Sequence, residues 1–152
     1  LALQLTPDDH WFFHGFVQVD VAANTNQITV INNLQSAPTV AGSVGISEQT
    51  FLFLDASAGY WWYRAINDDG LTGLASVIEL HYSSTINDSN VADVAGVTVG
   101  NSGNRIDVVN LTVGVHTEWF RNTSVRAAIV VPLDRQQRFF DSEAQLSVVR
   151  RY

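Results

Sequence analysis

The sequence predicts an all-β fold, an antiparallel up-and-down transmembrane β-barrel or the C-terminal portion of one. Apolar and polar residues alternate over long stretches, which is the period of a β-strand. These stretches are rich in Val, Thr, Ile and aromatic residues, which favour strands. No stretch has the pattern of a helix. Charged residues make up only 15% of the chain, against about 25% in a typical soluble domain. The alternative is a soluble antiparallel β-sandwich, because its strands alternate in the same way.

The alternation places strands at regular intervals along the chain. Six strong strands are expected, at 11–23, 50–64, 73–86, 105–120, 123–133 and 143–152. Two weaker candidates, 28–34 and 39–46, lie in the first long connection. The whole of 1–152 is expected to form one β-barrel domain, as part of a longer chain, since its length suits a single domain.

The connections between the strong strands alternate in length. The first, third and fifth are long or medium, whereas the second and fourth are short. In an antiparallel meander, alternate connections lie at the same end of the sheet, so the short ones share one end. Outer-membrane barrels have this asymmetry, with short periplasmic turns and longer extracellular loops.

Composition excludes several function classes. The net charge is −7, and every basic residue is Arg, which argues against nucleic acid as a partner because phosphate binding needs clustered cations. The chain has no Cys and therefore no disulfide, thiolate nucleophile or thiolate metal site. No apolar run reaches the roughly 18 residues that a transmembrane helix needs, whereas a transmembrane strand needs only about 9–11.

Each expected strand has an apolar and a polar face. In a sandwich the apolar face lies inside, whereas in a membrane barrel it meets lipid. The aromatic residues of the apolar face favour the barrel, because they fall at strand ends, where amphipathic rings meet a membrane interface. Those expected at the interface are Tyr60, Trp62, Trp119 and Tyr152 at the short-turn end and Tyr82 at the other.

The polar face mixes acids, Arg and His with small residues, as a packed or narrow lumen does. The residues predicted to line this lumen are Asp55, Glu79, His81, His116, Glu118, Arg126 and Arg151. Together with His14, these histidines and the two glutamates contain the ligand types of a divalent-metal site. A hydrogen-bonded lumen network explains the same residues more simply, so no metal and no cofactor are predicted.

Ser83, His81 and Asn110 contain the residue types of an outer-membrane lipase triad. A serine nucleophile needs a base within hydrogen-bond reach and a third group that orients this base. Nothing else marks Ser83 as a nucleophile, so no catalytic residue is assigned and the chain is not expected to be an enzyme.

The last thirteen residues, 140–152, resemble the C-terminal signal strand of bacterial outer-membrane β-barrel proteins. Tyr152, Val148, Leu146 and Ala144 match its alternating apolar pattern and aromatic end, whereas Arg150 departs from it. More loosely, the chain from Trp11 onward is similar to outer-membrane proteins of the porin or putative-transporter kind. The resemblance implies location in the bacterial outer membrane, contact with membrane lipid and assembly by the outer-membrane insertion machinery. A homo-oligomer is left open.

The leading functional hypothesis is therefore a passive pore or a transporter-like barrel. The second is a barrel that transports nothing and serves as an envelope anchor or scaffold. The third is a soluble β-sandwich that binds a partner or a carbohydrate through the aromatic residues Trp61, Trp62 and Tyr63.

Overall fold

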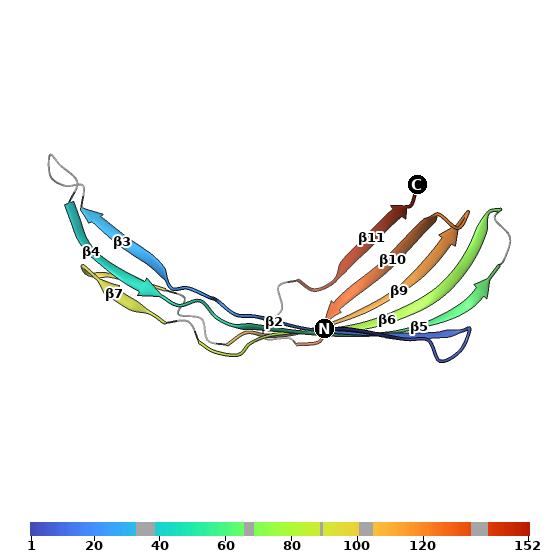
Figure 1. Ribbon diagram of the computed structural model, residues 1–152, viewed down its shortest axis with the longest axis horizontal. Helices are drawn as coiled ribbons and strands as arrows, with labels where there is room; N and C mark the ends of the chain where they lie inside the picture. The colour runs from blue at the N-terminus through green and yellow to red at the C-terminus, as the bar shows by residue number, and fades with distance from the viewer. Residues whose placement is uncertain (33–38, 66–68, 89, 101–104, 135–139) are drawn as a thin grey trace. The chain divides into compact units, whose positions relative to one another are not determined.

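A computed structural model describes the chain except for residues 33–38, 66–68, 89, 101–104 and 135–139 (Figure 1). The described residues form eleven strands and no helix. No segment in this part of the chain is a helix of the length and apolar character that would cross a membrane. The prediction of an all-β antiparallel fold is confirmed.

Seven strands form the main sheet, in the order β1-β2-β5-β6-β9-β10-β11. Their bounds are Ala2–Leu5, Trp11–Asp20, Phe51–Arg64, Leu71–Thr85, Asp107–Trp119, Thr123–Pro132 and Glu143–Arg150. Strands β5, β6, β9, β10 and β11 follow one another side by side in Figure 1. Within the described residues this sheet ends at β1 and at β11, so it is an open antiparallel sheet.

Contacts divide the described chain into two compact units. Unit 1 comprises 1–18, 53–83 and 107–152, and unit 2 comprises 19–52 and 84–106. Unit 1 contains most of the seven-stranded sheet and all the residues predicted to line a lumen.

Unit 2 contains two small hairpins. Strands β3 (Asn26–Asn32) and β4 (Thr39–Ile46) pair with each other, as do β7 (Ala92–Val94) and β8 (Val97–Val99). Asparagine side chains join the segments of this unit, since Asn90 accepts hydrogen bonds from the Ser47 amide and hydroxyl groups. The two weak strands expected at 28–34 and 39–46 are therefore present, apart from positions 33 and 34, which lie outside the described residues, but neither is part of the seven-stranded sheet.

All six strong strands are present close to their expected bounds. The sequence reading missed β1, which is only four residues long, and the short strands β7 and β8. Strand β1 pairs with β2 in the register Leu3↔Gly15 and Leu5↔Phe13. The alternation of β1 therefore continues the two faces of the sheet to a seventh strand.

Cross-strand contacts confirm how the two faces are composed. On the apolar face, the Trp11 and Tyr60 rings are 5.0 Å apart, and Ile129 is paired with Val113. On the polar face, Phe12 packs against Trp61 with ring centroids 5.6 Å apart. The pleat keeps the two sets separate along every strand.

Most large side chains on the apolar face of unit 1 are exposed. Its exposed members are Leu3, Leu5, Trp11, Phe13, Val17, Trp62, Ile78, Leu80, Val113, Val115, Trp119, Ile129, Val131, Leu133, Leu146 and Val148. Exposure reaches 67% for Trp62 and 75% for Leu146. Soluble monomers rarely expose a contiguous apolar patch of more than a few hundred Å².

The packed core of unit 1 lies on the opposite, polar face. It consists of Phe12, Ala75 and Val77, with Trp61 packed against them. Gly59 makes room for this cluster, because a Cβ built on it would lie 2.0 Å from the Phe12 ring. The buried core of unit 1 thus lies on the polar face, whereas most large side chains of the apolar face are exposed.

Candidate functional site

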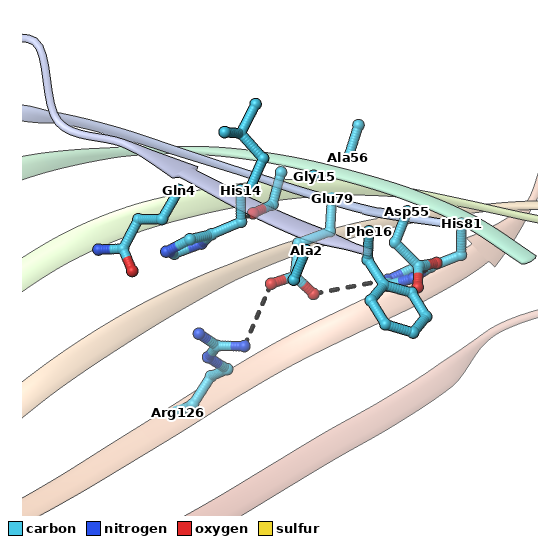
Figure 2. A pocket seen from close by; sticks show the side chains of 12 residues that line it. Ala2, Gln4, His14, Gly15, Phe16, Asp55, Ala56, Glu79, His81 and Arg126 are labelled. Atoms are coloured by element: carbon cyan, nitrogen blue, oxygen red, sulfur yellow. Dashed lines mark hydrogen bonds and ion pairs between the residues drawn. The ribbon is translucent and has the colours of Figure 1, made fainter. Parts of the chain in front are cut away.

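Four charged or titratable side chains form an ionic cluster on the polar face of unit 1. The cluster consists of Asp55 on β5, Glu79 and His81 on β6, and Arg126 on β10 (Figure 2). His81 Nδ1 donates to Asp55 Oδ1 at 2.8 Å, and His81 Nε2 lies 3.5 Å from Glu79 Oε2. Arg126 Nη1 donates to the other Glu79 oxygen, Oε1, at 3.1 Å.

Glu79 is the centre of this cluster. It is the least exposed of the four, at 18%, whereas the others are each about 40% exposed. Arg126 reaches it across the intervening strand β9. Charge-assisted bonds such as Arg126–Glu79 are stronger than neutral ones, so Glu79 holds the Arg126 guanidinium over the face of the sheet, with the His81 ring beside it.

The ionic cluster lines an open pocket of about 400 Å³. Its wall also includes Ala2 and Gln4 of β1, His14, Gly15 and Phe16 of β2, and the apolar or small residues Leu3, Ala56 and Ser57 (Figure 2). His14 Nδ1 is hydrogen-bonded to the Ser57 hydroxyl at 3.2 Å. The wall therefore combines acidic, basic and neutral polar groups from β1, β2, β5, β6 and β10.

A second polar group lies closer to the short-turn end of the sheet, where the connections 6–10, 65–70 and 120–122 occur. His116 Nε2 is 3.8 Å from Glu118 Oε1, and the His116 ring packs edge-on against Trp61 at 5.7 Å. Arg126 is paired directly with His116 across the β9–β10 ladder. The two polar groups thus meet at Arg126.

The structure brings together six of the seven residues predicted to line a lumen. Asp55, Glu79, His81 and Arg126 form the ionic cluster, and His116 and Glu118 form the second group. Arg151 stands apart from both: it follows the last residue of β11, and its backbone N–H donates to Asn122 O at 2.7 Å. Sequence reading placed Arg151 by extending the strand pleat beyond the residue where the strand ends.

Neither metal-site nor triad geometry is present in the described residues. No three His, Asp or Glu residues there are arranged to hold a metal ion. His81 contacts Asp55 and Glu79 rather than Ser83. The arrangement is that of a hydrogen-bonded ionic network facing open space.

Aromatic rings gather on the apolar face at the short-turn end. Trp11, Tyr60 and Trp62 form a continuous row, with centroids 5.0 and 4.9 Å apart, and Trp62 Nε1 donates to the Ser76 hydroxyl. Tyr82, near the other end of β6, donates to Asp107 at 2.9 Å. The sequence predicted Tyr60 and Trp62 as interface residues but not Trp11. Trp11 is two residues before Phe13, so the strand pleat places both on the apolar face.

The aromatic residues proposed for a soluble binding module do not form one surface. Trp61 is on the polar face, half-buried against Phe12 and with the Arg64 guanidinium 4.8 Å from its ring centre. Trp62 is on the apolar face and Tyr63 is exposed beside it in sequence. Alternate facing therefore separates Trp61 from Trp62.

Sequence reading noted His14 but missed Gln4 and Ser57 as members of the pocket wall. Both lie on the polar face, but β1 was not recognised and Ser57 is a small residue without a charge. The missing signal is the register of β1 with β2, which the four residues of β1 do not reveal. Comparison with protein-family models, with curated proteins and with solved structures finds no match.

Proposed function

We propose that this chain forms all or part of an outer-membrane β-barrel whose polar face lines a water-filled passage for small solutes. One observation supports this most directly: the apolar face of the seven-stranded sheet is exposed, whereas the packed core and the ionic cluster lie on the polar face. A bilayer covers such a face at no cost, because apolar side chains there replace contact with water by contact with hydrocarbon.

Strand length and edge aromatics support the same proposal. The inner strands β5, β6 and β9 have 14, 15 and 13 residues, and a tilted strand needs about 9–11 to cross the hydrocarbon. The row of Trp11, Tyr60 and Trp62 lies at one end of the apolar face, where an interfacial belt is expected.

The polar face suits a passage that prefers cations. Three carboxylates, those of Asp55, Glu79 and Glu118, accompany the single guanidinium of Arg126 in the two polar groups. A channel lined with an excess of carboxylates attracts cations. We propose a passive role, in which the charges on the polar face select the solutes that pass.

The exposure of the apolar face is tested by labelling single introduced cysteines. The labelled position is unambiguous because the chain has no native cysteine. Leu146→Cys and Ser147→Cys are a matched pair, adjacent on β11, exposed, and on opposite faces. After reconstitution into vesicles, the Leu146→Cys thiol should react with a lipid-soluble maleimide and resist a water-soluble one. The Ser147→Cys thiol should react with the water-soluble reagent.

A soluble β-sandwich gives the opposite result. Its apolar face would be covered by protein, so the Leu146→Cys thiol would resist both reagents in a protein that stays in the aqueous phase. That outcome would exclude the membrane proposal.

The passage is tested by conductance in a planar bilayer. We expect steps with a higher permeability for cations than for anions. Glu79→Gln should lower the cation preference and Arg126→Gln should raise it, because the two changes remove opposite charges from one ion pair. Membrane insertion without conductance would favour an anchor or scaffold instead.

A further inference from the structure

Arg150 has an unexpected position on the apolar face. It is paired with Thr123 in the β10–β11 ladder, and Val148, two residues earlier, is paired with Val125 of the apolar face. The pleat therefore puts the Arg150 side chain on the same face as the exposed Val148 and Leu146. A charge there lies at the end of β11, beside the short turn after β9.

The surroundings of Arg150 form a pocket with an apolar and a polar side. The pocket has a volume of about 360 Å³ and is lined by Trp119, Phe120, Asn122, Thr123, Val125 and Arg150. Trp119, Phe120 and Val125 supply apolar surface that continues into the exposed face of the sheet. Arg150, Asn122 and Thr123 supply polar groups at the short-turn end.

No carboxylate among the described residues lies within ion-pair distance of Arg150. Its guanidinium lies 5.7 Å from the centre of the exposed Tyr152 ring. A guanidinium in this setting has its planar fork available for a phosphate, to which arginine can donate two parallel hydrogen bonds.

We propose that this pocket binds an anionic phospholipid, with the headgroup phosphate on Arg150 and the first part of an acyl chain against Trp119 and Val125. The proposal rests on the membrane location proposed above and specifies one lipid site within it. An amphiphile fits because the cation stands at the end of an apolar strand face. Basic pockets between transmembrane helices bind acidic lipid headgroups, and Arg150 at the end of an apolar strand face offers the same charge complementarity.

The test places a fluorophore next to the pocket. Val148→Cys labelled with bimane lies on the apolar face beside Val125, and Leu3→Cys carries the same label on β1, the far edge of the same face. Each labelled protein is reconstituted into phosphatidylcholine vesicles that contain brominated phosphatidylglycerol or brominated phosphatidylcholine at equal mole fraction. Bromine quenches bimane only at short range.

At Val148→Cys, the phosphatidylglycerol should have an apparent association constant about fivefold above that of phosphatidylcholine, since one arginine at an anionic lipid surface contributes about this factor. At Leu3→Cys the ratio should be close to one. Arg150→Gln should bring the Val148→Cys ratio to about one, and Arg150→Lys should retain only part of the preference, because lysine keeps the charge but loses the planar fork. Arg151→Gln is the matched control, because Arg151 is adjacent and does not line the pocket.

Three results would overturn the lipid site while leaving the membrane proposal intact. They are the absence of a preference in the inserted wild type, a preference that survives Arg150→Gln, and an equal loss in Arg151→Gln. Competition by inorganic phosphate, beyond that of chloride at matched ionic strength, would show a free-phosphate site and would also overturn it. A chain that fails to enter vesicles overturns both proposals.

Discussion

Arg126 on β10 reaches over β9 to Glu79 on β6, with Nη1 and Oε1 3.1 Å apart. On the same face of β9, His116 is paired with Arg126, and Gly114 is the next residue on that face. Gly114 of β9 is paired with Ala128 of β10, and a Cβ on Gly114 would lie 2.7 Å from the Ala128 Cβ. This small-residue pair lies next to the His116–Arg126 pair in the β9–β10 ladder.

The Glu79–Arg126 pair should contribute a measurable but small coupling energy. We expect a double-mutant cycle of Glu79→Gln and Arg126→Gln to give about 0.2–1 kcal/mol, the range for partly exposed pairs. The measurement is urea unfolding of the reconstituted protein at low and high salt, and the coupling should fall as salt screens it. A coupling of zero at low salt would mean that the two groups do not interact in the membrane.

Gly59→Ala should destabilise the sheet. The added methyl group collides with the Phe12 ring, at 2.0 Å from its nearest carbon, and overpacking of this kind costs about 1–3 kcal/mol. Phe12→Leu in the same chain should restore part of the loss. Gly15→Ala is the control, because nothing lies within 4 Å of its added Cβ, and an equal loss there would contradict the steric explanation.

Arg121→Gly should stabilise the hairpin between β9 and β10. Phe120 and Arg121 have positive φ angles of 51° and 56°, a conformation that costs a non-glycine residue about 1–2 kcal/mol. We expect a gain of about 1 kcal/mol in the free energy of unfolding. Arg121→Ala removes the same side chain without relieving the backbone, so a gain there would show that the side chain, and not the φ angle, is responsible.

Asp8 should make the start of β2 sensitive to acid. Its Oδ1 accepts hydrogen bonds from the amides of Trp11 and His10, at 2.6 and 2.8 Å. These bonds hold the pKa of the Asp8 carboxyl below its ordinary value, so its contribution to stability is present above about pH 4. That contribution disappears as the pH falls through the lowered pKa of the folded state.

The difference in stability between wild type and Asp8→Ala should accordingly be present at neutral pH and shrink at acidic pH. Unfolding curves of both proteins across this range measure it. Asp9→Ala is the neighbouring control. A difference that stays constant with pH would assign the effect to something other than the carboxylate.

Alternation along the chain was enough to predict the six long strands and the residues on each face, because the pleat has a fixed period of two. Contacts between strands depend on register and curl, which the pattern does not contain. Thr112, for example, was placed on the polar face with residues that line the pocket, yet it is only 5% exposed. The contact between Glu79 and Arg126 across β9 also depends on strand register, so the alternation could not predict it.

Short elements and strand ends were the other limit. The four residues of β1 contain too few alternations to be recognised, although they supply Ala2 and Gln4 to the pocket wall. Arg151 was predicted to continue the pleat, but β11 ends at Arg150. A pattern of period two gives no information once the strand that generates it has stopped.

The number of strands in the main sheet determines how its two edges can be joined. Neighbouring strands run in opposite directions, so the first and seventh, β1 and β11, run in the same direction. Direct pairing of these two edges would create a parallel junction in an otherwise antiparallel sheet. A ring with only antiparallel junctions has an even number of strands, so any such ring that contains this sheet includes an odd number of additional ones.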